Sequence, residues 1–270
     1  MQNLKFIVST TIAVSTILGI GAATAADLPA RAYTKAPAVV ATPNWYGSFI
    51  GVNGGGAFGN DGINILGGTG AFALMPALTV ASKPSGELGG VTWGTNWQTD
   101  RFVYGFISDF DYADIHDSGP IVAPNTTGSV EQRLRWFSTS RVRLGYLLMD
   151  NLLLYGSGGL ADGDTIVRGS ASAFIAGRNL PGTVAVDSSK FRYGWAAGGG
   201  LEYQIGRWSV MFDYVHYDLG KRDVVAFGPV AGDSLSTSTR FSGDVIRGGL
   251  NYRFNWTFFD LVTGARPFSW

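Results

Sequence analysis

Apolar and polar side chains alternate along several stretches of the chain with the two-residue period of a β-strand. In residues 101–112, for example, Phe102 and Tyr104 lie on one face, and Asp109 and Asp111 lie on the other. Eight stretches of this kind predict strands at residues 45–58, 89–98, 101–112, 132–147, 151–161, 191–205, 207–218 and 241–256. The pattern therefore predicts an all-β protein whose strands have an apolar and a polar face, although the glycine-rich segments 45–58 and 151–161 leave their face assignment open.

The connections between these strands alternate in length. The short ones are tight turns at Thr99-Asp100, Met149-Asp150 and Gly206. The long ones are expected to be loops at 59–88, 113–131, 162–190 and 219–240, and all of them contain proline, which interrupts the ladder of a sheet. Long loops at one end and tight turns at the other are typical of an eight-stranded antiparallel up-and-down transmembrane β-barrel. Its four long loops would be extracellular and its three short turns periplasmic.

The apolar faces are rich in Trp, Tyr, Phe and Leu, which are too bulky for eight strands to enclose. We therefore place these faces outward, against lipid, and the polar faces inward. The inward charges should pair with one another, because a buried charge persists only when it is neutralised. The predicted interior charge network consists of Asp109, Asp111, Arg135, Arg141, Arg143, Glu202, Asp213, Arg247 and Arg253. A barrel filled in this way is expected to be plugged, and a narrow conducting path remains the alternative.

Aromatic residues also collect near the short turns and the chain ends. An aromatic ring with a polar tip suits the level of the lipid headgroups, where barrels carry girdles of such residues. The predicted girdle consists of Trp45, Trp97, Phe102, Tyr146, Tyr203, Trp208 and Trp256. Ordinary core packing of the same residues is the alternative.

The first 25 residues are typical of a secretory signal peptide. Lys5 supplies the positive charge, residues 6–20 form the apolar segment, and Ala23 and Ala25 flank a small-residue cleavage site. Once this segment is removed, no run of 18 apolar residues remains, so the mature chain is predicted to have no transmembrane helix.

The predicted organisation has four parts. The signal peptide covers residues 1–25, a proline-containing periplasmic leader covers 26–44, the barrel covers 45–256, and a C-terminal tail covers 257–270. The role of the tail is left open.

Composition removes several classes of protein. The chain has no cysteine, which excludes a disulfide framework and a thiol nucleophile. Its 20 basic and 20 acidic residues form no basic block, which argues against nucleic-acid binding. Only His116 and His216 could serve as a general base, and no Gly-x-Ser-x-Gly motif accompanies them. We therefore predict neither an enzyme nor a metal or cofactor site.

Several short segments, in order, resemble one family. They include Asn96-Trp97-Gln98, the run 141–146, the run 155–160 and Asn251 to Trp256. Together with Ala26 to Arg31 they resemble alphaproteobacterial small outer-membrane β-barrel proteins, also called porin-family or opacity-like surface proteins. The resemblance implies an eight-stranded barrel in the Gram-negative outer membrane and a surface antigen, without one defined activity. Ile107 and Met211 depart from it, because relatives often place charges there.

The last predicted strand carries a second pattern. Gly249, Tyr252 and Phe254 resemble the C-terminal signal that the barrel-assembly machinery reads during insertion. An exposed strand edge can pair with the edge of another sheet, which gives the signal a physical basis. The alternative is that any terminal barrel strand alternates aromatics.

The expected function is mainly structural, in envelope integrity and at the cell surface. Two alternatives are a narrow porin for small solutes or ions, and a surface adhesin or ligand-binding module that acts through the extracellular loops. The expected partners are outer-membrane lipid, lipopolysaccharide and the assembly machinery, with lipid contacts at residues such as Lys83, Arg168 and Arg178. The oligomeric state is left open.

Overall fold

The computed structural model describes residues 44–59, 62–174 and 182–264. The predicted signal peptide with Ala23 and Ala25, the leader up to residue 43, Arg178 and the end of the tail lie outside these ranges. Within them, no helix is both long and apolar enough to cross a membrane.

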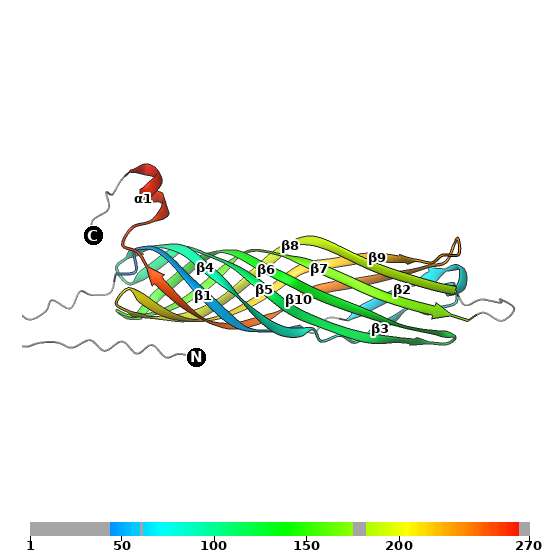
Figure 1. The fold of residues 1–270 in the computed structure, drawn as a ribbon. Helices are drawn as coiled ribbons and strands as arrows, with labels where there is room; N and C mark the ends of the chain where they lie inside the picture. The colour runs from blue at the N-terminus through cyan, green and yellow to red at the C-terminus, as the bar shows by residue number, and fades with distance from the viewer. Residues whose placement is uncertain (1–43, 60–61, 175–181, 265–270) are drawn as a thin grey trace, which may run out of the picture. The chain divides into compact units, whose positions relative to one another are not determined.

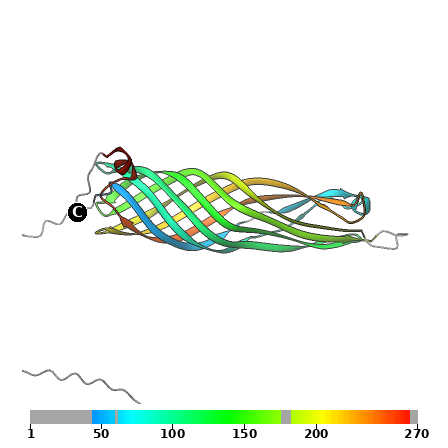
Figure 2. The same cartoon turned by 45° about the horizontal axis from the view of Figure 1, so that its top comes forward.

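Ten antiparallel strands form one sheet that closes on itself (Figures 1 and 2). Their bounds are β1 Gly47–Phe58, β2 Ile63–Thr69, β3 Leu78–Val80, β4 Ser85–Thr99, β5 Phe102–Ala123, β6 Thr126–Met149, β7 Leu152–Ala173, β8 Gly182–Ile205, β9 Trp208–Phe227 and β10 Ser234–Arg253. The ring consists of β1 and β4 to β10, and it closes where β1 pairs with β10. The strands β2 and β3 extend the wall beside β10. The predicted eight-stranded antiparallel barrel is confirmed.

The strands run further than the sequence pattern indicated. Most residues of the expected long loops belong to hairpins, of which β5 and β6 form one that turns at Pro124-Asn125. Buried positions continue to alternate with more exposed ones along parts of these hairpins, as over 222–227 of β9 and 234–239 of β10, whereas 163–167 of β7 are all buried. Figure 1 shows these hairpins at one end of the barrel and the short turns at the other. Pro120 lies inside β5, where the ladder with β4 has already ended at the Ser85–His116 pair, so β5 loses no bond on that side.

The outer face carries a belt of exposed apolar side chains. Phe102, Phe106 and Tyr112 on β5 are 63%, 49% and 67% exposed. Similar side chains follow on the neighbouring strands, including Leu144 and Trp208. A water-soluble protein rarely exposes so large a continuous apolar surface, whereas a membrane barrel requires one.

The interior is layered along the barrel. Near the short turns lies an apolar cluster with Trp45, Phe49, Ile107 and Met211. A larger apolar cluster fills the part enclosed by the long hairpins. The eight inward charged residues on the strand segments beside the first cluster, among them Asp109, Arg141 and Arg247, are buried as well. Ile107 and Met211, the two positions where relatives often carry charges, therefore contribute to an apolar layer instead.

One irregularity changes which side chains face inward. The register of β6 shifts between Leu134 and Phe137 against β7, and a bulge of this kind inverts the alternation. Leu134, which the sequence pattern placed outward with Trp136, is consequently buried. The bulge also determines the position of Arg135.

Two glycines make room for aromatic rings in the narrow interior. A Cβ atom on Gly94 would lie 2.6 Å from the Phe49 ring, and one on Gly200 would lie 2.7 Å from the Tyr155 hydroxyl. The second would also lie 2.2 Å from the Phe212 carbonyl oxygen. Neither site tolerates a side chain without movement of its surroundings.

We predict that Gly200→Ala lowers the free energy of unfolding by about 1–3 kcal/mol, because an added methyl group displaces the Tyr155 ring. The matched control is Gly156→Ala, where a Cβ atom would have no neighbour nearer than 3.9 Å. That control should change stability by no more than about 0.5 kcal/mol. Urea titration of the folded barrel, followed by heat-modifiable gel migration, measures both, and equal effects would contradict the packing described.

Candidate functional site: a charged plug inside the barrel

Arg247 on β10 lies at the centre of a buried cluster of charges. Its guanidinium nitrogens lie 2.6 Å from Asp109 Oδ2, 2.8 Å from Asp111 Oδ2 and 3.0 Å from Asp213 Oδ2. Arg141 on β6 lies 2.9 Å from carboxylate oxygens of both Asp109 and Asp213. All five side chains have 0% exposure. Charge-assisted bonds of this length are strong, and here they join β5, β6, β9 and β10 across the lumen.

Hydroxyl groups from other strands complete this cluster. Thr92 on β4 and Thr139 on β6 each donate to Asp109 at 2.8 Å. The Tyr155 hydroxyl on β7 donates to Asp213 at 3.1 Å. Asp109 therefore accepts bonds from four side chains, which offsets the cost of removing its charge from water.

A second cluster surrounds Glu202 on β8. Arg143 lies 2.6 Å from Glu202 Oε2, and Arg253 lies 3.5 Å from Oε1. Ser209 donates to the same carboxylate at 2.5 Å, and the Asn251 amide donates at 3.3 Å. The Arg143 guanidinium also lies 4.4 Å from the centre of the Tyr155 ring, which borders both clusters.

Trp45 closes the short-turn end from inside the barrel. It is fully buried, and its indole N–H donates to the Asp150 carbonyl oxygen at 3.0 Å. The Arg253 guanidinium lies 4.7 Å from the ring centre and donates to the Trp45 carbonyl oxygen at 2.7 Å. The prediction that Trp45 belongs to the lipid-facing girdle is wrong, because the buried arginine provides an inward partner for its ring.

The other predicted girdle residues lie around the short-turn end. Phe102, Tyr146, Tyr203 and Trp208 are between 42% and 63% exposed. Phe102 contacts Tyr146 edge-on, with ring centres 5.3 Å apart.

Trp97 and Trp256 contact the C-terminal helix α1 (Phe258–Thr263). The ring centres of Trp97 and Phe259 are 5.7 Å apart, and those of Trp256 and Phe258 are 5.8 Å apart. The helix begins with a capping box between Thr257 and Asp260. Aromatic packing at the short-turn end therefore continues from the barrel into the tail.

Arg135 does not join the interior network, and its prediction as an interior residue is wrong. The bulge in β6 turns its side chain outward, where it is 53% exposed and 2.7 Å from Asp164. Asp164 also accepts a hydrogen bond from Ser189 at 2.6 Å. Arg133 likewise contacts Asp114 on the outside, at 2.9 Å.

The eight remaining residues of the predicted network are buried in the lumen. They comprise four arginines and four carboxylates, and the structure pairs each of them with a residue of opposite charge. The alternation of side chains along the strands predicted that these eight charged residues face inward. It could not identify the residues that contact them, which are Thr92, Tyr155, Ser209 and Trp45.

Each of the two histidines lies beside an aspartate on the outer side of the barrel. His116 lies 3.2 Å from Asp114, and His216 lies 2.9 Å from Asp244. The His216 ring also contacts Trp195. Within the residues that the structure describes, no group of three potential ligands is placed to hold a metal ion.

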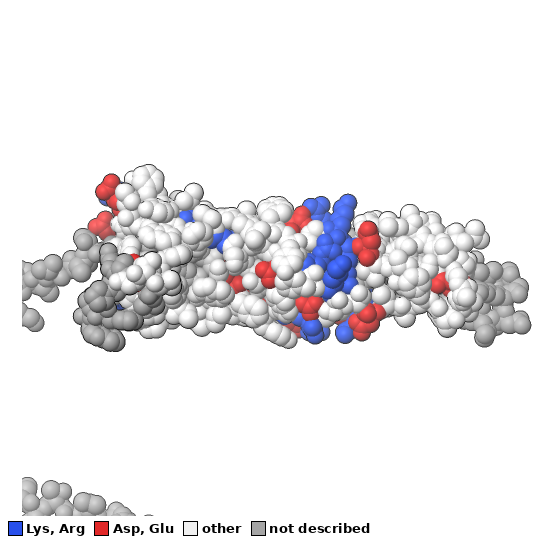
Figure 3. Space-filling view, turned by 90° about the horizontal axis from the view of Figure 1, so that it is seen from above, with Lys and Arg blue, Asp and Glu red and all other residues white. Residues whose placement is uncertain are grey.

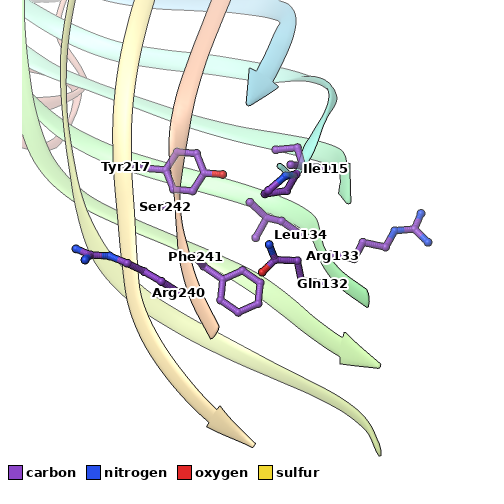
Figure 4. Close-up of a pocket in the computed structure, with 9 residues that line it drawn as sticks. Ile115, Gln132, Arg133, Leu134, Tyr217, Arg240, Phe241 and Ser242 are labelled. Atoms are coloured by element: carbon purple, nitrogen blue, oxygen red, sulfur yellow. The ribbon is translucent and has the colours of Figure 1, made fainter. Parts of the chain in front are cut away.

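Beyond the charged layer the barrel stays filled. Figure 4 shows Tyr217, Leu134 and Phe241 converging on a space of about 10 Å³, whereas Arg133 and Arg240 point away from it. This volume suffices for about one water molecule and not for a solute.

The residues of the predicted assembly signal lie on β10 and just after it. Tyr252 packs against Trp208 with ring centres 5.1 Å apart, and Phe254 packs against Tyr252 at 5.3 Å. Gly249 leaves room for Val52 and Met211, which a Cβ atom would approach to 3.2 Å. Their role in assembly stays a prediction.

The chain is similar to named outer-membrane proteins. It is 34% identical over 225 residues to the 31 kDa outer-membrane immunogenic protein of Brucella melitensis, which covers 82% of this chain and 88% of that one. It is 30% identical over 167 residues to the 22 kDa outer membrane protein of Rhizobium leguminosarum, covering 62% and 65%. No family model matches the chain.

Among solved structures, the Yersinia pestis attachment invasion locus protein Ail covers 75% of this chain and 99% of its own, with 13% identity and a TM-score of 0.29. Neisserial surface protein A covers 77% and 96%, with 10% identity and a TM-score of 0.31.

We predict that Asp213→Asn lowers the free energy of unfolding by about 3–5 kcal/mol, because it removes the carboxylate that Arg141 and Arg247 share and leaves the buried plug as a whole with one uncompensated positive charge. Asp114→Asn is the matched control, since its ion pairs lie on the outer face and contribute about 0–1 kcal/mol. Denaturant titration of both variants decides the point. Equal losses in the two variants would show that the plug is not what stabilises the barrel.

Proposed function

The chain belongs to the family of outer-membrane proteins that includes the 31 kDa outer-membrane immunogenic protein of Brucella, and we propose that it acts as a closed structural barrel of that membrane. The observation that carries this proposal is the plug. Arg141, Arg143, Arg247 and Glu202 are all at most 1% exposed inside the lumen. A side chain with no accessible surface has no water-sized space beside it, so water cannot pass along these groups.

Opening such a lumen would be costly. A permeating ion would have to separate Arg247 from Asp109, Asp111 and Asp213, and breaking one buried ion pair costs about 3–5 kcal/mol. The layer around Trp45 and Phe49 on one side and the larger apolar cluster on the other would add further barriers. These features support a scaffold over the alternative of a narrow channel.

The remaining features fit a surface role. The rigid hairpins extend beyond the apolar belt and offer the part of the molecule that other cells or molecules would contact. The packing of His216 on the exposed Trp195 ring fits an interfacial position for this residue. Gly249, Tyr252 and Phe254 remain candidates for recognition by the assembly machinery, and residues 1–25 for a signal that is removed on export.

We predict that the folded wild-type barrel produces no discrete conductance steps in planar bilayers, because its lumen holds no continuous water path. Heat-modifiable migration must first show that the inserted protein is folded. Reproducible steps from the folded wild-type protein would overturn the proposed closed barrel.

We predict that the double variant Arg141→Ser/Asp213→Ser conducts weakly, since it removes one charge of each sign from the plug, leaves the net charge unchanged and keeps the two apolar layers as the remaining barriers. The control is Arg133→Ser/Asp114→Ser, which removes an equivalent pair from the outer face. Conductance should appear in the first variant and not in the second. A folded plug variant that remains silent would show that other layers close the lumen.

A further inference from the structure

The barrel wall splits between β8 and β9. Their ladder runs up to the Trp195–Asp218 pair and resumes only at Ala185–Phe227. No ladder pair joins the residues between, which are 186–194 on β8 and 219–226 on β9. The split begins at Gly220, whose positive φ of 77° bends β9 and inverts its alternation. A Cβ atom at Gly220 would lie 3.2 Å from the Arg192 guanidinium, so the bend also makes room for that side chain.

Two arginines bridge the split from opposite sides. From β8, Arg192 donates to the carbonyl oxygen of Leu219 at 2.9 Å and to that of Lys221. From β9, Arg222 donates to the carbonyl oxygens of Thr165 at 2.8 Å and Ser188 at 3.1 Å. The bonds to Leu219, Lys221 and Ser188 satisfy carbonyl groups on the two strands that the ladder no longer joins, and the bond to Thr165 ties Arg222 to β7. They leave the arginine charges unneutralised, because a carbonyl oxygen carries no full charge.

The split gathers four cations that form no direct ion pair within the described ranges. Among the described residues, no carboxylate lies within 4 Å of the side-chain nitrogens of Lys190, Arg192, Lys221 or Arg222. The other outward arginines near the end of the apolar belt behave differently. Arg133, Arg135, Arg168 and Arg240 each contact a carboxylate, on Asp114, Asp164, Asp187 and Asp218 respectively. At longer range, Asp218 and Asp223 attract Arg192, and Asp164 attracts Arg222. Asp164 and Asp218 are already bonded to Arg135 and Arg240, so Asp223 is the acidic side chain left to offset the four cations. The split therefore carries a positive excess.

The cations of the split can be reached from outside. Lys190 and Lys221 are exposed and Arg192 is half-buried. Lys190 and Arg192 lie on the same face of β8 as Ala196, which is buried inside the barrel. Because no ladder joins β8 to β9 at residues 190 and 192, this face is open to solvent there. Arg222 lies beneath them, 5% exposed. In Figure 3, Lys and Arg side chains gather in one band across the barrel, with Asp and Glu at its margins.

The split lies where the lipid-facing belt ends. On β8, the exposed aromatic residues Trp195, Tyr193 and Phe191 are followed on the same face by Ser189 and Asp187. On β9, the exposed Tyr214 is followed by His216 and Asp218. This end of the belt is the one next to the long hairpins, so the cations lie at the level of the outer-leaflet headgroups.

We propose that the β8–β9 split binds the phosphate groups of an outer-leaflet glycolipid. Lys190, Arg192 and Lys221 would contact the phosphate, and Arg222 would contribute positive charge from beneath. Arg192 uses two of its five N–H groups on carbonyl oxygens, so three remain to donate to phosphate oxygens. The acyl chains of the same molecule would lie on Tyr193 and Trp195. A lipid is favoured over free phosphate because the cations and the exposed apolar side chains adjoin.

The test measures binding of phosphorylated lipid A to the folded full-length mature protein in detergent micelles. Lys190→Gln/Lys221→Gln should weaken binding roughly 10-fold or more, since two cations facing the phosphate are lost. Neither ammonium group has an ion pair within the described residues, so the fold should persist, which heat-modifiable migration checks. The control is Arg133→Gln/Arg135→Gln, which removes the same charge from arginines that have carboxylate partners. It should change binding less than about threefold.

Two further measurements separate the site from general attraction. Lipid A without its phosphates should bind the wild-type barrel no better than phosphorylated lipid A binds the lysine double variant. Inorganic phosphate should compete only at concentrations far above those of the lipid. Equal weakening in both double variants, equal binding of the dephosphorylated lipid, or competition by inorganic phosphate at the lipid's own concentration would each overturn the proposal. None of these outcomes depends on whether the barrel conducts.

Discussion

Arg247 contacts three carboxylates inside the lumen, and the need to neutralise such buried charges constrains the rest of the barrel. Eight strands enclose a space that side chains fill, so water cannot screen a charge placed there. Each buried charge must then be neutralised by another side chain. The cluster around Arg247 holds three carboxylates and two arginines, and the cluster around Glu202 holds one carboxylate and two arginines. Each cluster is unbalanced by one charge, in opposite senses, and together they are neutral.

This arrangement links the register of the strands to the chemistry of the lumen. Arg247 pairs in the ladder with Asp213 on the neighbouring strand, and Arg141 pairs with Ile107. A slip of one residue would turn these charges toward lipid and bring Phe212 or Phe106 into the lumen. Buried ion pairs contribute little net stability against well-packed apolar residues, so specifying the register is a physical reason for their presence. The Tyr155 ring, which fits only because residue 200 is glycine, borders both clusters and separates them from the wall.

The alternation of side chains was sufficient to predict the eight-stranded ring and most inward charges, because lipid outside and a narrow lumen inside impose opposite demands on alternate residues. It failed where the backbone breaks the period of two. Arg135 lies in a bulge that no residue type in the sequence indicates. Lys221 and Arg222 come directly after Gly220, where the alternation of buried and exposed positions inverts. Trp45 was misplaced for a different reason, since an aromatic ring near a turn suits either the headgroups or a buried guanidinium. The long hairpins were missed because prolines indicated loops, although Pro120 lies where β5 has lost its ladder with β4.

The absence of cysteine from the sequence allows the most direct test of a closed lumen. A single cysteine at Ile107, which is 0% exposed and inward-facing beside the charged clusters, would report whether water reaches that layer. A cysteine at Asp150, in an exposed short turn, provides the comparison. The account predicts that a hydrophilic maleimide labels the Asp150→Cys protein at once but labels the folded Ile107→Cys protein only after heat denaturation. Rapid labelling of folded Ile107→Cys would contradict the closed barrel.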